Sequence, residues 1–199
     1  MPGSRPRQAR CYTALVSSVA PIAHALTYRD LANVPDDGNL WEVVDGVLHV
    51  TPFPSYAHQN AVTQLVTVLN QHVRAHGLGK VFTSGLMVVL DEPTGVGPDV
   101  VYVSAARMSA MREDGYHGAP DLCIEVLSSK PDLDRTIKLQ KYARSGVPHY
   151  WIVDPVAHVL WAHRLDGGEY RLAIRLEQDA TFEPELFPGL RLTLADLWV

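Results

Sequence analysis

Residues 120–154 constrain the fold of this chain more than any other segment, because they place a carboxylate inside an apolar strand. Leu122 to Ser128 is predicted to be a strand with Glu125 near its middle. A buried carboxylate is costly unless something pairs with it. A helix is predicted from Pro131 to Arg144 and a second apolar strand from Tyr150 to Val153. This order of strand, helix and strand is typical of an α/β fold in which helices cover a sheet.

Successive side chains of a strand point to opposite faces, which divides the first strand into two sets. One set is wholly apolar and comprises Leu122, Ile124 and Val126. The other set contains Glu125 between Cys123 and Leu127. We therefore expect one face of this strand to be pure core and the other to present Glu125 to a functional site.

The predicted helix carries chemistry-bearing side chains at four-residue steps. At about 100° per residue, Asp134, Lys138 and Tyr142 share one face, and Lys141 falls on the same face. Periodicity alone favours a solvated stripe with an Asp–Lys pair that contributes a few tenths of a kcal/mol. Beside a metal-bound water, such a lysine would instead orient the water or stabilise charge on a phosphate.

The remaining sequence predicts a mixed α/β fold in which helices flank a central sheet. Asp45-Gly46 between two apolar runs is a strong hairpin signal, and Ser55 is predicted to cap a helix that ends at Gly77. Further strands are predicted at 81–84, 86–90, 99–103, 159–165 and 170–176, helices at 27–31, 105–112 and 193–197, and loops at 95–98 and 114–119. We expect residues 1–26 to be a flexible N-terminal extension and residues 27–199 to form one domain.

Composition narrows the classes of function. The chain has 199 residues, 47% of them hydrophobic, which suits one domain with a substantial core. Its formal net charge of -5 argues against a protein that holds nucleic acid by charge alone. Cys11 and Cys123 have no zinc spacing and predict no disulfide, so a cytoplasmic location is the default expectation. No apolar run approaches the roughly 18 residues of a membrane span.

Two acids stand in or at the start of apolar strands. Asp99 follows Pro98 where a loop enters a strand, and Glu125 lies within the strand described above. Alone, each is explained as well by a turn cap or by a half-exposed sheet. Carboxylates from neighbouring strands can also hold a hard cation such as Mg²⁺. The helix stripe that follows Glu125 favours this metal-site interpretation.

Several motifs occur in the order found in a known family. They are Trp41-Glu-Val-Val-Asp-Gly, His58, Gly97-Pro-Asp-Val-Val, Pro120-Asp-Leu-Cys-Ile-Glu-Val-Leu-Ser, the stripe of Asp134, Lys138 and Tyr142, and Gly146-Val-Pro-His-Tyr-Trp-Ile-Val-Asp. The chain resembles the Uma-type restriction endonucleases, a bacterial branch of the PD-(D/E)XK nuclease superfamily, over roughly residues 27–195. Each motif is weak alone, but the ordered set is specific.

The resemblance implies a restriction-endonuclease-like core and a hydrolase that cleaves DNA phosphodiester bonds with Mg²⁺ or Mn²⁺. Asp99 would be the first acid of the signature and Glu125 the second. The backbone carbonyl of Val126 would add a metal ligand, and Glu42 matches an acid that many such sites receive from the N-terminal part. The family often has a histidine at the position of His58, for which contact with the site or the substrate is one interpretation and a polar helix end the other.

One position departs from the superfamily signature. A lysine is expected two residues after the second acid, and Leu127 stands there. The family usually places a lysine on the following helix instead, where Lys138 matches, with Lys141 and Lys130 as further candidates. A migrated lysine is acceptable because only the position of its ammonium group matters.

Two other functions remain open at the level of sequence. One is a nuclease-fold binding module with little or no catalysis, which the acidic composition favours slightly. The other is a metal-dependent phosphodiesterase that acts on small molecules. A homodimer is also open, because the apolar C-terminal strands and residues 197–199 suit either an interface or simple core packing.

Overall fold

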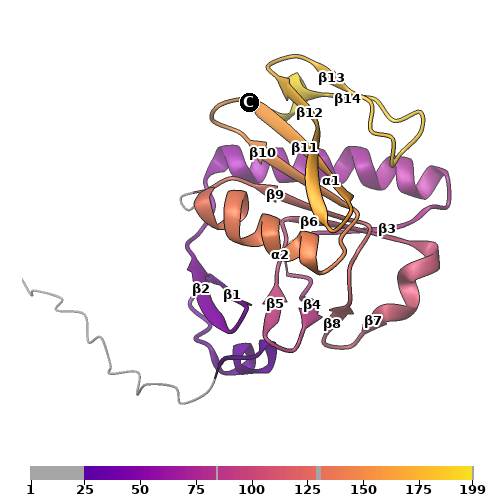
Figure 1. Cartoon of the computed structure of the whole chain (residues 1–199). Coiled ribbons are helices and arrows are strands. Elements are labelled where there is room, and N and C mark those ends of the chain that lie inside the picture. Colours follow the sequence, from indigo (N-terminus) through magenta and orange to yellow (C-terminus); the bar gives the residue numbers. More distant parts are fainter. Residues whose placement is uncertain (1–24, 84, 129–130, 199) are drawn as a thin grey trace, which may run out of the picture.

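The computed structural model describes residues 25–83, 85–128 and 131–198, which form a mixed α/β fold built on two sheets (Figure 1). The predicted N-terminal extension, with Cys11, lies outside these residues except for its last two positions. Lys130 also lies outside them. The mixed α/β class expected from the sequence is confirmed.

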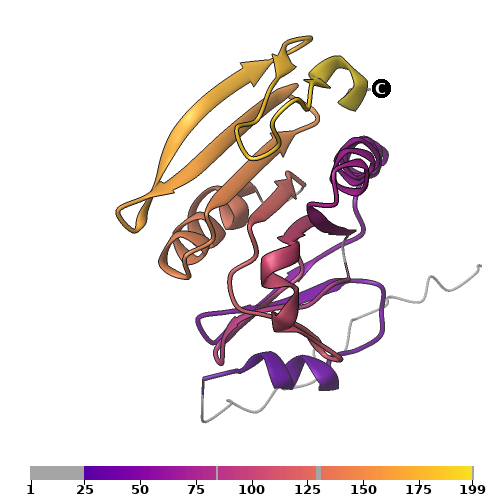
Figure 2. The same ribbon diagram turned by 90° about the vertical axis from the view of Figure 1, so that its right-hand side faces the viewer.

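The larger sheet has the strand order β12-β11-β10-β9-β6-β3. Its strands are β3 (Gly79–Thr83), β6 (Val100–Ser104), β9 (Leu122–Val126), β10 (His149–Asp154), β11 (Val159–Asp166) and β12 (Glu169–Glu177). In this sheet β9 and β10 pair in parallel, and the chain between them forms a helix. The other neighbouring strands of the sheet are antiparallel. Helices α1 (Tyr56–Ala75) and α2 (Leu139–Arg144) lie on opposite sides of this sheet (Figure 2).

A second sheet, which also has six strands but mostly shorter ones and is called the smaller sheet below, was not expected. Its order is β2-β1-β5-β4-β8-β7, with β1 (Leu40–Val44), β2 (Val47–Thr51), β4 (Val88–Asp91), β5 (Thr94–Val96), β7 (Met111–Arg112) and β8 (Gly115–His117). The β1–β2 hairpin turns at Asp45 and Gly46, which both have positive φ, as predicted. Loops were predicted at 95–98 and 114–119, and both predictions are wrong where β5 and β8 form. Pairing with distant strands overrides the local glycine signals there.

Short elements complete the fold. The 3₁₀ helices are η1 (Tyr28–Asn33), η2 (Ala105–Ala110) and η4 (Leu194–Leu197), and β13 (Thr181–Phe182) pairs with β14 (Leu192–Thr193). The helix predicted over 105–112 is therefore shorter than expected and ends where β7 begins. Within the residues that the structure describes, no helix is long and apolar enough to cross a membrane.

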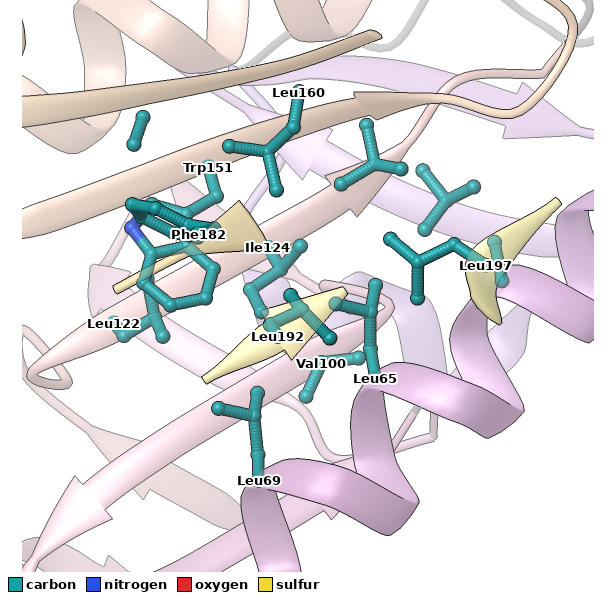
Figure 3. Close-up of a cluster of buried hydrophobic side chains, with 14 of the residues drawn as sticks. Leu65, Leu69, Val100, Leu122, Ile124, Trp151, Leu160, Phe182, Leu192 and Leu197 are labelled. Carbon is teal, nitrogen blue, oxygen red and sulfur yellow. The ribbon is translucent and has the colours of Figure 1, made fainter. Parts of the chain in front are cut away.

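Strand β9 is buried on both faces, which corrects the expectation of one open face. Leu122 and Ile124 pack against α1 in a cluster with Trp151 and Leu160 of the neighbouring strands (Figure 3). On the opposite face, Cys123 and Leu127 join a second cluster with Tyr142 and Tyr150. Glu125, which is only 4% exposed, thus stands on a strand that contacts core on both sides. Its charge must be satisfied from within the protein.

Candidate catalytic site

One narrow cleft brings together all the side chains that the sequence singled out as catalytic. The ionisable side chains that line it are Glu42, His58, Asp99, Glu125, Asp134 and Lys138. Glu42 comes from β1 of the smaller sheet, Asp99 from the residue before β6, and Glu125 from β9. Val126 also lines the cleft. Their convergence agrees with the expected geometry, while their roles stay predictions.

The Lys138 ammonium group lies at the centre of the carboxylates. Its Nζ is 2.9 Å from Glu42 Oε1, 3.0 Å from Glu125 Oε1 and 3.5 Å from Asp134 Oδ1. The hydroxyl of Tyr142 donates a 2.8 Å hydrogen bond to the same Glu125 oxygen. A lysine on the helix therefore reaches the second acid although Leu127 occupies the usual lysine position.

The local helix geometry explains why Lys138 and Tyr142 both reach Glu125. Residues Leu133–Lys138 form a π-helical stretch that continues directly into α2. A π-helix turns each residue by about 85° instead of 100°, because its hydrogen bonds join i to i+5. On this geometry Asp134 and Lys138 lie within about 20° of each other, and Tyr142, one α-helical turn beyond Lys138, stays on the same side.

Lys141 accordingly serves a different cluster. Its Nζ is 2.7 Å from Asp45 Oδ1 and 2.5 Å from Asp91 Oδ2, at the ends of two hairpin strands of the smaller sheet. Arg144 also contacts Asp45, at 2.7 Å. The placement of Lys141 on the face of Lys138, and with it its candidacy as the site lysine, is therefore wrong. From Lys138 to Lys141 the helix has ordinary α-helical spacing, which turns the Lys141 side chain about 60° away from that of Lys138.

Asp99 is held rigidly by two donors. Its Oδ2 accepts a 2.9 Å hydrogen bond from the Val126 amide and lies 3.1 Å from Nε2 of His58, in the first turn of α1. The amide of Leu127 donates to the Val153 carbonyl of β10. Because backbone groups alternate in direction along a strand, the amide and carbonyl of Val126 point to the β6 side. Following the β6–β9 register, the residue opposite Val126 is Pro98, which has no N–H. The sheet therefore provides no ladder donor for the Val126 carbonyl at this position.

Burial dominates the electrostatics of the cleft. It raises the pKa of Glu125 well above its ordinary value, against the opposing effect of Lys138. It also raises the pKa of Asp134 to about 6, again opposed by Lys138. Burial disfavours the Lys138 ammonium too, but the surrounding carboxylates outweigh it and raise the pKa of Lys138 well above its ordinary value. The lysine is therefore charged at neutral pH.

The chemistry of the cleft fits a hard divalent cation. The carboxylates of Asp99 and Glu125 and the carbonyl of Val126 are oxygen donors, which Mg²⁺ prefers. Glu42 Oε2 is buried, and nothing in the described part of the chain hydrogen-bonds it. Among these residues no group of three or more His, Cys, Asp or Glu side chains is already arranged around a metal position. Lys138 instead takes up the carboxylate oxygens, so the ammonium and a cation compete for them.

Asp134→Asn is expected to stabilise the protein at pH 8 by about 3 kcal/mol, and this gain should vanish below about pH 4. Because the pKa of Asp134 is about 6 in the folded state and ordinarily 3.8, the folded state binds more protons between these values. Wild-type stability therefore falls as pH rises through this window, and asparagine removes that loss. Urea unfolding in EDTA at pH 4 and pH 8 measures the effect.

Asp132→Asn is the matched control, because Asp132 precedes the same π-helical stretch but is exposed. Its effect should be within about 0.5 kcal/mol at both pH values. A gain for Asp134→Asn that is equal at pH 4 and pH 8 would contradict the burial argument.

Three side chains of the site, His58, Asp134 and Tyr142, have a weak signal in the sequence. His58 was left between two interpretations, and the structure places it against Asp99 at 5% exposure. Asp134 and Tyr142 were recognised in the helix stripe but not assigned to the site, and both contact its charged groups. The four-residue spacing that runs through Lys138 was the signal that identified them.

Comparison with known proteins identifies the family and the fold. The model of the Uma2 family, described as putative restriction endonuclease, matches residues 27–195. Among solved structures, a putative nuclease from Anabaena variabilis superposes with a TM-score of 0.71 and 22% sequence identity, covering 87% of this chain and 97% of that chain. At this identity the likeness concerns the fold, and it confirms the restriction-endonuclease-like architecture. A search of curated proteins gave no match.

Proposed function

Because the chain belongs to the Uma2 family, we propose that it is a divalent-metal-dependent endonuclease that hydrolyses DNA phosphodiester bonds. The observation that carries the proposal is the Lys138 ammonium, which lies within 3.0 Å of both Glu42 and Glu125 in the cleft that Asp99 shares. Acids from two sheets and a charged lysine converge there at positions that match the order of the nuclease signature.

Each residue has a chemical role in this proposal. Asp99, Glu125 and the Val126 carbonyl would hold Mg²⁺ or Mn²⁺, with Glu42 as an additional oxygen donor. When bound, the cation would lower the pKa of the water that it binds and neutralise charge on the phosphate. His58 and the Val126 amide fix the rotamer of Asp99. Tyr142 holds Glu125 from the core side.

Lys138 would orient the attacking water or stabilise the charge that develops on the phosphate. Water attacks phosphorus in line, a new oxygen–phosphorus bond forms, and the bond to the leaving oxygen of the DNA strand breaks. The proton of the attacking water leaves to solvent or to a group in the cleft, and the departing strand oxygen takes a proton from solvent to become a hydroxyl. The ammonium that contacts Glu125 is thus expected to turn towards the phosphate when the substrate is bound.

Cleavage of supercoiled plasmid DNA tests the proposal. Wild type is expected to nick or linearise it with Mg²⁺ and not in EDTA, and Asp99→Asn should lower the rate by roughly 100-fold or more. Asp121→Asn is the control, because Asp121 directly precedes β9 and bonds the Ser104 amide outside the cleft. It should stay within about threefold of wild type, since a substitution outside the site leaves transition-state interactions intact. Equal rates in all three proteins would contradict the proposal.

A small-molecule phosphodiesterase is favoured by one specific observation, the depth of the site. Glu42 is 1% exposed and Glu125 is 4% exposed, so a small substrate reaches them more easily than a rigid polymer does. Hydrolysis of a chromogenic phosphodiester without cleavage of any DNA would support this second function.

A further inference from the structure

The segment between β2 and α1 carries two aromatic rings that the fold leaves exposed. Phe53 is 75% exposed and Tyr56 is 73% exposed. Thr51 at the end of β2 and His58 in the first turn of α1 both line the cleft. The short link that carries both rings therefore begins and ends at residues of the catalytic cleft.

Both rings are presented from a stiff backbone. Pro52 and Pro54 flank Phe53, so this segment is held in an extended conformation. The Phe53 ring also rests on Gly38, where an added Cβ would lie 2.5 Å from its Cζ atom. Tyr56 is the first residue of α1, whose N-cap Ser55 accepts a hydrogen bond from the His58 amide. The backbone that carries both rings is therefore fixed, and Gly38 supports the Phe53 ring.

The depth of the acids limits which nucleic acids can reach them. Glu42, Asp99 and Glu125 are between 1% and 8% exposed. A phosphate must enter the narrow cleft to meet them, and pairing and stacking restrain the backbone of an intact duplex. An unpaired strand can bend its phosphate inward and leave its bases outside. Bases freed in this way stack readily on aromatic side chains.

We propose that Phe53 and Tyr56 form a base-stacking platform for unpaired nucleotides of the strand whose phosphate enters the cleft. The proposal rests on the nuclease function above and assigns it a substrate class, single-stranded DNA or unpaired DNA segments such as overhangs and loops. Stacking is tolerant of sequence because every base has a π-face. The platform therefore selects for strand state and not for a base sequence.

Binding of fluorescein-labelled oligonucleotides, followed by anisotropy, tests this proposal in the full chain. A 20-nucleotide single strand and the matching duplex are compared with Ca²⁺ in place of Mg²⁺, since Ca²⁺ takes the same oxygen ligands. Wild type should bind the single strand more tightly. Phe53→Leu and Tyr56→Leu should each weaken this binding roughly tenfold, as loss of one stacked base predicts. The duplex affinity should change less than about twofold, because paired bases do not stack on side chains.

Two controls separate stacking from other effects. Phe53→Trp keeps an aromatic face and should retain single-strand binding, while Val156→Ala removes an 83% exposed apolar side chain from the β10–β11 turn and should change nothing. Unchanged single-strand binding in both leucine variants would overturn the platform and leave the nuclease proposal standing. An equal loss for single strand and duplex would overturn it as well. Absence of any DNA binding or cleavage by wild type would overturn both proposals.

Discussion

Glu125→Gln is expected to lower DNA cleavage by roughly a thousandfold or more and, at the same time, to raise the free energy of unfolding at pH 8. The activity falls because glutamine removes a charged oxygen donor from the centre of the site. The stability rises because burial raises the pKa of Glu125, which means that the folded state disfavours its charge despite the contact with Lys138. The Tyr142 hydroxyl can still donate to the remaining amide oxygen.

The opposite signs of these two changes make the experiment informative. Cleavage rates of plasmid DNA and urea unfolding at pH 8 in EDTA are measured on the same preparations. Glu169→Gln is the matched control, because Glu169 is exposed at the start of β12, and it should change neither quantity appreciably. A Glu125→Gln protein that is less stable but fully active would contradict both arguments.

Lys138→Met is expected to destabilise the folded protein by about 3–5 kcal/mol at pH 8, which is typical when one partner of a buried charge cluster is removed. The side chain is 3% exposed, and its loss leaves the carboxylates of Glu42, Glu125 and Asp134 without their cation. Without it the pKa values of Glu125 and Asp134 rise further, so the folded state binds more protons than the unfolded chain. The destabilisation should therefore shrink as pH falls, because protonation removes the uncompensated charges.

Lys141→Met supplies the matched control for this loss. It is the same substitution three residues further on, but the partners Asp45 and Asp91 are each nearly half exposed and keep their solvation. We expect a loss of about 1 kcal/mol with weaker pH dependence. Urea unfolding at pH 5 and pH 8 compares the variants. Equal losses in both, or a Lys138→Met loss that grows at pH 5, would contradict the proposed electrostatics.

The elements that the sequence predicted correctly are those with strong local signals. The Asp45-Gly46 turn and the Ser55 cap act through backbone chemistry that neighbouring residues determine. The sequences of β9 and β10 are apolar runs because these two strands form a parallel pair that is buried on both faces. The acids at 42, 99 and 125 could be assigned because ordered motifs, and not periodicity alone, identified them.

The elements that the sequence did not predict depend on distant contacts. Strand β5 has three residues, all of which pair with β4, and Gly95 also pairs with β1 on the other side, so its strand conformation depends on pairing that the Gly95 turn signal conceals. The π-helical stretch at 133–138 likewise has no sequence signature. A strand buried on both faces also escaped parity reasoning, because an acid at position 125 suggested an open side.

The two lysines of this helix fasten the same hairpin at different depths. Lys138 contacts Glu42 in the interior of β1, while Lys141 contacts Asp45 at the hairpin turn. Glu42 and Glu125 belong to different sheets. The distance between their side chains therefore depends on how the two sheets are held relative to each other, and not on β1 or β9 alone. The contacts of Lys141 with Asp45 and Asp91 lie outside the cleft. Under the proposed function, Lys138 could therefore release its carboxylates to a cation while Lys141 keeps α2 attached to the smaller sheet.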